Sequence, residues 1–191
     1  MNLIKFAKYF SYIFVPTTFT VWLFIFASLS FQIHPTIPII LSLLLTFIIP
    51  ILVFIYLKNR GNIKDYDASI KEERTSLYVI GIILCLIGFI ISLLSNYSVN
   101  FTVLWFIYII NSIFLIIINK YWKISAHLIG VSAPIAAFYY WGSFNAVILL
   151  ILSLILAWAR LKLKMHSVLQ IIAGFLFGIL LTYLQLKIFI G

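Results

Sequence analysis

The run SLYVIGIILCLIGFIISLL occupies residues 76–94 and contains no charged side chain. An α-helix needs roughly 20 apolar residues to cross the hydrocarbon core of a bilayer, and this run provides nearly that number. It is continuously apolar, whereas the strands of a membrane barrel alternate between apolar and polar residues. Residues 76–94 therefore predict a transmembrane helix.

Six further apolar segments lie on either side of this run. They cover residues 9–31, 36–57, 101–119, 125–141, 145–159 and 166–190. The segments at 125–141 and 145–159 are short, which suits tilted or partly broken spans. The pattern predicts an all-α fold, a polytopic transmembrane helical bundle with about six or seven spans.

The composition supports one membrane domain over residues 1–191 with almost no soluble part. Of the 191 residues, 65% are hydrophobic and only 9% are charged, whereas soluble domains have about a quarter charged residues. The first apolar segment is long and lacks a small-residue cleavage pattern, so we expect no cleaved signal peptide. Cys85 is the single cysteine, which excludes an internal disulfide, and we interpret it as a small apolar side chain within a span.

The basic residues are divided unequally between the two sides of the membrane. With seven crossings, twelve of the 13 lysines and arginines share the side of the amino terminus, and only Lys187 lies opposite. The positive-inside rule predicts that the basic side is cytoplasmic, in a plasma or inner membrane. The net charge of +9 favours anionic lipid headgroups and phosphate-bearing lipids as partners. Nucleic acid is not expected because the charges lie in short loops, and the oligomeric state is left open.

Three segments on the basic side contain side chains suited to catalysis. They read KDYDASIKEERT (64–75), KISAHLIG (123–130) and RLKLKMHSVLQ (160–170). In the last, His166 and Gln170 are four residues apart and share a helix face, so Gln170 can accept a hydrogen bond from Nδ1 and leave Nε2 free to attack. Arg160 can fold back and present its planar donors to a phosphate. The alternative is an interfacial arginine anchor and a histidine in the headgroup region.

The second segment starts a helix. Ser125 is expected to be its N-cap and His127 to lie in its first turn, where free backbone N–H groups form an anion site. A histidine there can act as general acid or base. The alternative is a capping serine beside an interfacial histidine.

The first segment places Lys71 and Arg74 three residues apart, on one face if helical. Its alternative is a solvated mixed-charge loop, and for Asp65 and Asp67 we expect a salt-bridged loop, pairing with Lys71 or Arg74, and not a magnesium site. Two of the three histidines start helices beside basic residues on one membrane face, which favours a functional site. The third, His34, falls on the opposite side, and we assign it no role.

The spacing of these residues resembles the motifs of the type 2 phosphatidic acid phosphatase family, whose fold is related to that of vanadium haloperoxidases. The third motif of that family is Ser-Arg, five residues, His, three residues and Asp. Here Arg160, His166 and Gln170 stand at the matching spacing, with Ala159 in place of the serine and Gln170 in place of the aspartate.

The other two motifs match in part. The second, Pro-Ser-Gly-His, reads Ile124-Ser125-Ala126-His127. The first, Lys, six residues and Arg-Pro, ends here in Arg74-Thr75 but has Asp67 at the lysine position, so Lys71 or Lys64 would have to supply the ammonium group. The resemblance covers residues 58–190 as a phosphatase-like core, including the glycine-bearing AGFLFG (173–178), and leaves the two N-terminal spans in 1–57 outside.

The resemblance implies hydrolysis of a lipid phosphate through a phosphohistidine, without a metal or other cofactor. His166 would be the nucleophile, oriented by Gln170, and His127 the general acid and then the general base. The implied phosphate-binding groups are Lys71, Arg74, Ser125, Ala126 and Arg160. Phosphatidic acid, phosphatidylglycerophosphate and polyprenyl phosphates all fit as substrates.

Two other functions stay open at this point. The departures at Asp67 and Gln170 would suit a non-catalytic lipid-binding or transport protein on the same fold. His127 and His166 could instead serve as axial ligands of haem, although such ligands usually lie inside a bundle and not at helix starts.

Overall fold

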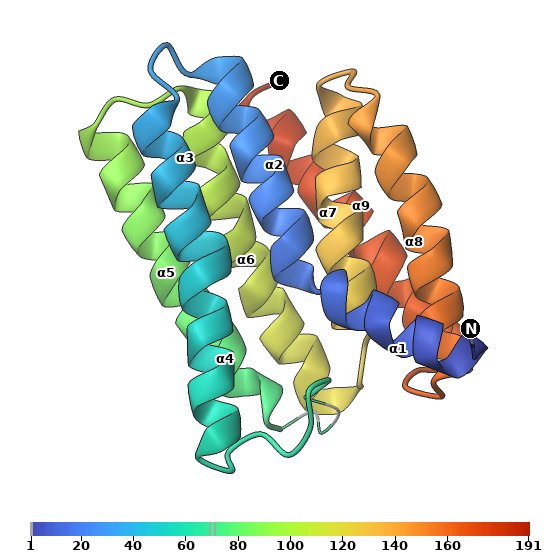
Figure 1. The fold of residues 1–191 in the computed structure, drawn as a ribbon. Coiled ribbons are helices and arrows are strands. Elements are labelled where there is room, and N and C mark those ends of the chain that lie inside the picture. The colour runs from blue at the N-terminus through green and yellow to red at the C-terminus, as the bar shows by residue number, and fades with distance from the viewer. Residues whose placement is uncertain (1, 69, 71) are drawn as a thin grey trace.

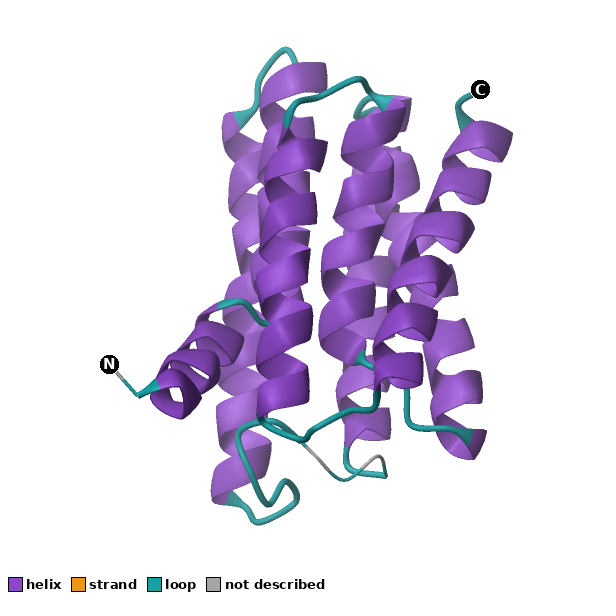
Figure 2. Ribbon diagram, turned by 90° about the vertical axis from the view of Figure 1, so that its right-hand side faces the viewer, coloured by secondary structure: helices purple, strands orange, loops and turns teal. Residues whose placement is uncertain are grey.

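The computed structural model describes residues 2–68, 70 and 72–191, and these residues form helices and loops without a strand. Within this part of the chain, five helices are long and apolar enough to cross a membrane, and a bent helix pair raises the number to six. They lie side by side in one bundle, as Figures 1 and 2 show. The chain is therefore an all-α, multi-pass helical bundle, as the apolar segments predicted. The five helices are Thr36–Asn59 (α3 to α4), α5 (Arg74–Leu94), α6 (Val99–Tyr121), α8 (Asn145–Lys162) and α9 (Val168–Phe189).

The first apolar segment forms two helices where we expected one. α1 (Leu3–Ile13) and α2 (Pro16–Phe31) meet at a bend of 46°. Pro16 is the first residue of α2, a position where its missing N–H is harmless and its fixed φ favours the helix. α1 therefore lies obliquely at the side of the bundle in Figure 2, and its Phe6 ring packs 6.1 Å from the ring of Trp158 on α8.

The second span contains one widened turn. α3 (Thr36–Leu43) passes through the π-helical turn η1 (Leu44–Ile48) into α4 (Ile49–Asn59). Pro50 is the second residue of α4, and because proline has no N–H to donate, the regular hydrogen-bond ladder cannot continue through it. A π-bulge accommodates such a defect without ending the helix.

The short helix α7 (Ala126–Tyr140) is the centre of the bundle. Every residue from 127 to 138 is buried, and the helix packs against α2, α8 and α9. Glycines of α9 allow close approach: a Cβ added at Gly174 would lie 2.9 Å from the Ser125 carbonyl oxygen, and one at Gly178 would overlap the Ser132 hydroxyl. AGFLFG is therefore a packing surface, and it brings the starts of α7 and α9 together.

The three segments singled out in the sequence meet at one end of the bundle. The loops before α5, before α7 and before α9 all lie at the lower end of Figure 1. Contacts connect them, since Arg160 pairs with Asp67 and Arg74 reaches the Ile124 carbonyl. The chain thus assembles one cluster from distant segments, and the Arg160–Asp67 pair alone joins residues 93 positions apart in sequence.

Candidate functional site

His166 is held by the start of α9. Its Nδ1 lies 3.1 Å from Gln170 Oε1, the contact that the spacing predicted. The same oxygen accepts the Ser167 N–H at 3.1 Å, and the Ser167 hydroxyl accepts the Gln170 N–H at 3.3 Å. This reciprocal pair is a capping box, which fixes the glutamine side chain against the helix start.

The capping box also determines the tautomer of His166. A backbone N–H can only donate, so the Gln170 group that faces Ser167 must be the amide oxygen. That oxygen can only accept from His166, so Nδ1 carries the proton and Nε2 carries a lone pair. His166 Nε2 is buried, and no described residue forms a hydrogen bond with it. A neutral imidazole with an unpaired Nε2 is the form that a nucleophile requires.

Three cationic side chains surround this imidazole. Burial, and then the positive charges of Arg160 and Arg74, lower the pKa of His166 to about 3, and Lys123 contributes in the same direction. The Gln170 hydrogen bond opposes this shift. Burial, Arg74 and Arg160 in turn lower the pKa of Lys123. Such a concentration of positive charge around one buried group favours an anionic ligand.

The low pKa of His166 predicts acid sensitivity of the fold. The unfolded chain binds a proton at His166 with a pKa of about 6.5, whereas the folded chain does so only near pH 3. Stability is therefore fully present above pH 6.5 and is lost as the pH falls toward 3. His166→Gln should remove this contribution, so its melting temperature in detergent should fall less between pH 7 and pH 4.5 than that of the wild type. His34→Gln, at an exposed position far from the site, is the matched control; equal pH dependence in all three proteins would contradict the assignment.

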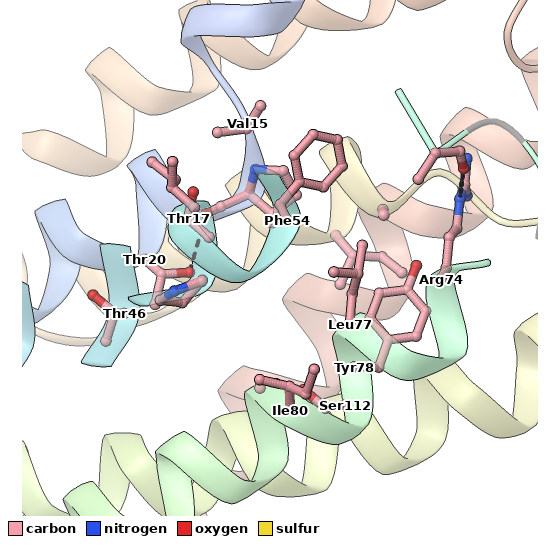
Figure 3. A pocket seen from close by; sticks show the side chains of 18 of the residues that line it. Val15, Thr17, Thr20, Thr46, Phe54, Arg74, Leu77, Tyr78, Ile80 and Ser112 are labelled. Atoms are coloured by element: carbon pink, nitrogen blue, oxygen red, sulfur yellow. Dashed lines mark hydrogen bonds between the residues drawn. The ribbon is translucent and has the colours of Figure 1, made fainter. Parts of the chain in front are cut away.

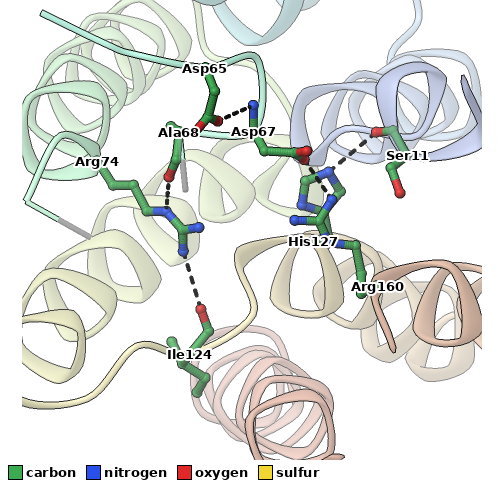
Figure 4. Close-up of polar contacts among 8 residues, drawn as sticks. All are labelled: Ser11, Asp65, Asp67, Ala68, Arg74, Ile124, His127 and Arg160. Atoms are coloured by element: carbon green, nitrogen blue, oxygen red, sulfur yellow. Dashed lines mark hydrogen bonds and ion pairs between the residues drawn. The ribbon is translucent and has the colours of Figure 1, made fainter. Parts of the chain in front are cut away.

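Arg160 is paired with an internal carboxylate. Arg160 Nη1 lies 2.6 Å from Asp67 Oδ1, with only 1% and 6% of the two side chains exposed. The loop contains a salt bridge at Asp67, and among the described residues its partner is Arg160, where we expected Lys71 or Arg74. Lys71 lies outside the described residues. The Asp67 carboxylate is thus an internal anion that occupies the Arg160 guanidinium, as Figure 4 shows.

Arg74 holds the loop in this position. Its Nε donates to the Ala68 carbonyl oxygen at 2.6 Å and its Nη1 to the Ile124 carbonyl oxygen at 3.4 Å. Ala68 has a φ of 43°, in the left-handed region, which turns its carbonyl toward the arginine. Lys64, the other candidate for the first-motif ammonium, has its backbone N–H bonded to the Glu73 carboxylate at 3.1 Å.

The start of α7 provides further polar groups. Ser125 is the N-cap, as predicted, but its hydroxyl makes no capping bond and is buried without a partner in the part of the chain that the structure describes. Ala126 is the first residue of the helix, where backbone N–H groups lack intrahelical acceptors. His127 lies 3.3 Å from the Ser11 carbonyl oxygen through Nε2, so the proton is on that nitrogen. Helix α1 therefore contributes to the site, although it lies outside residues 58–190, the part of the chain that resembles the phosphatase family.

Most of the predicted residues meet at this site, and three more belong with them. Lys123, Asp67 as a carboxylate, and Ser11 were not assigned to it from the sequence. Lys123 directly precedes the second motif, so its position was a usable signal, whereas nothing in the sequence indicated Ser11. Among the described residues no group of three or more His, Cys, Asp or Glu side chains could hold a metal ion.

Comparison of the chain with known protein families, with curated proteins and with solved structures gave no match. Function therefore has to be inferred from the geometry and charge of the site.

Proposed function

We propose that the protein is a membrane-embedded phosphatase that hydrolyses a lipid phosphate through a phosphohistidine on His166. The observation that carries this proposal is the state of that side chain. Gln170 holds its Nδ1–H, and among the described residues its buried Nε2 has no partner while the cations Arg160, Arg74 and Lys123 act on it. A neutral histidine in a cationic pocket combines a nucleophile with binding groups for a phosphate.

The first chemical step transfers the phosphoryl group to the enzyme. His166 Nε2 attacks phosphorus, and the bond from phosphorus to the lipid oxygen breaks. Arg74, Arg160 and Lys123 balance the charge on the non-bridging oxygens, and this electrostatic support is the main source of catalysis in phosphoryl transfer. The substrate phosphate takes the place of the Asp67 carboxylate on Arg160, so one anion is exchanged for another.

In the same first step His127, which carries a second proton once the phosphate dianion is bound, gives its Nε2 proton to the departing lipid alkoxide and becomes neutral. The lipid oxygen replaces the Ser11 carbonyl oxygen as the acceptor of that proton.

The second step regenerates the histidine. The neutral His127 accepts a proton from water as the water oxygen attacks phosphorus. Cleavage of the bond from phosphorus to His166 Nε2 releases inorganic phosphate and restores the starting state.

The position of the site favours a lipid substrate, because the site lies at the end of a bundle of membrane helices. Phosphatidic acid, phosphatidylglycerophosphate and polyprenyl phosphates share the phosphate group that these residues would bind. Phosphate release by the purified protein from each of these lipids, with and without EDTA, tests the proposal. We expect release from at least one lipid and no effect of the chelator. Binding of lipid phosphates without any release would favour the non-catalytic lipid-binding alternative.

We further propose that the site faces the cytoplasm. With seven crossings, twelve of the 13 basic residues would fall on the same side as the site, and the positive-inside rule assigns that side to the cytoplasm. Asn62 is exposed in the loop before α5, and Ser95 is exposed at the opposite end of that helix. In a Cys85→Ser background, Asn62→Cys should resist an impermeant thiol reagent added to intact cells, while Ser95→Cys should react. The reverse pattern would place the site outside.

A further inference from the structure

A cavity of about 540 Å³ extends from the site into the bundle. Its mouth is lined by Asp67, Arg74 and His127, which belong to the site. Its deep end reaches Cys85 on α5 and Tyr108 on α6. Figure 3 shows part of the lining, with Arg74 at one side and Phe54 and Leu77 among the wall residues. One continuous space therefore joins a polar mouth, which includes the Arg74 guanidinium, to the interior of the membrane domain.

The wall of this cavity is suited to a hydrocarbon and not to a polar ligand. Most of its lining is aliphatic or aromatic. The Thr20 and Thr46 hydroxyls donate to the Pro16 and Ser42 carbonyls of their own helices, and the Asn111 amide donates to Thr182. These three polar groups are satisfied, so an apolar ligand would leave none of them without a partner. The hydroxyls of Thr17, Tyr78 and Tyr108, which also line the cavity, are buried without a partner among the described residues, so the wall is apolar in most but not all of its area.

Asp67 stands at the boundary between this cavity and a second hollow. The second space has a volume of about 320 Å³ and is lined by Lys8, Asp65 and Met165, among others, on the other side of Asp67. Polar side chains make up more of its lining. Arg74 and His127 of the site line the apolar space, and Asp67, the partner of Arg160, lines both spaces. This arrangement matches a molecule with a hydrocarbon tail and an anionic head.

We propose that the larger cavity holds one hydrocarbon chain of the lipid phosphate while its phosphate binds at the mouth, an inference that rests on the proposed function. A cavity of about 150 Å³ holds a benzene molecule, so about 540 Å³ accommodates roughly 20 carbons. That is the size of one long chain and too small for two. The substrate class is therefore a lipid phosphate recognised through a single alkyl or isoprenyl chain.

Gly81 offers a way to fill this cavity. It lines the space, and a Cβ added there meets no atom within 4 Å. Gly81→Phe should lower kcat/KM for hexadecyl phosphate at least 10-fold and leave kcat/KM for p-nitrophenyl phosphate, which has no chain, near the wild-type value. Ile83→Phe is the matched control, because Ile83 lies on the same helix, is 51% exposed and does not line the cavity. Ile83→Phe should leave kcat/KM for both substrates at the wild-type value.

A binding experiment separates this inference from the proposed function. A hexadecyl phosphate with a diazirine at the chain end should label the wild-type cavity wall near Cys85 or Tyr108, and Gly81→Phe should abolish that label. Labelling confined to exposed residues such as Ile83 would overturn the chain site. An equal fall of kcat/KM for both substrates in Gly81→Phe would overturn it as well. If the wild type labels at the wall but hydrolyses neither substrate, the chain site stands and the phosphatase proposal fails.

Discussion

His166→Ala should abolish phosphate release from every lipid phosphate, because it removes the atom that forms the covalent intermediate. His127→Ala should be slower than the wild type by about 10²–10⁴-fold with an alkyl substrate, the usual cost of losing a general acid or base. The two variants should differ most with an aryl phosphate. A good leaving group departs without a proton, so His127→Ala should complete the first step and accumulate phosphohistidine, whereas His166→Ala should form no intermediate.

Gln170 provides an internal comparison for the two histidines. Gln170→Ala should be milder than either histidine variant, because it only releases the imidazole from its orientation. Gln170→Asp should raise the rate, since a carboxylate at this place would stabilise the imidazolium by charge. Steady-state phosphate release measures all four variants. Full activity in His166→Ala would refute the role of this residue.

Arg160→Met should lower both stability and catalysis, for separable reasons. The ion pair with Asp67 is buried, and breaking such a pair leaves an uncompensated charge that costs about 3–5 kcal/mol. Loss of a donor to the developing phosphoryl charge should lower kcat by about 10²–10³-fold. Adding Asp67→Asn to Arg160→Met removes the stranded carboxylate, so the double variant should regain most of the stability but none of the activity.

Asp67→Asn alone should strengthen the binding of inorganic phosphate, whereas Arg160→Met removes a phosphate-binding group. It frees Arg160 from its internal anion, so inorganic phosphate should inhibit this variant at lower concentrations than the wild type. Thermal unfolding in detergent and phosphate inhibition are the two measurements. Recovery of activity in the double variant would show that Arg160 serves only to neutralise Asp67.

The helices of the bundle were predictable from the sequence because each depends on local composition. Residues 76–94 lie within α5. The short segment 125–141 forms α7, and because protein surrounds this helix it does not need the length of a helix that faces lipid. The break before Pro16 was missed, because apolar composition alone does not show whether a proline starts a helix or lies within one.

The candidate site was predictable only where its contacts are local. His166 and Gln170 are one helical turn apart, so their spacing was sufficient. The partner of Arg160 is 93 residues away and that of His127 is 116 residues away, and both depend on how the helices pack. The motif comparison placed Asp67 at a lysine position, which gave no reason to expect its carboxylate on Arg160.

The most direct test of the central claim is to locate the phosphoryl group on the enzyme during turnover. His127→Ala would be mixed with an aryl phosphate, quenched within milliseconds under alkaline conditions that preserve phosphohistidine, and mapped by mass spectrometry. Our account predicts one phosphoryl group per chain on His166, and none when His166 is also replaced by alanine. A phosphoryl group on any other residue, or hydrolysis without a phosphoenzyme, would contradict it.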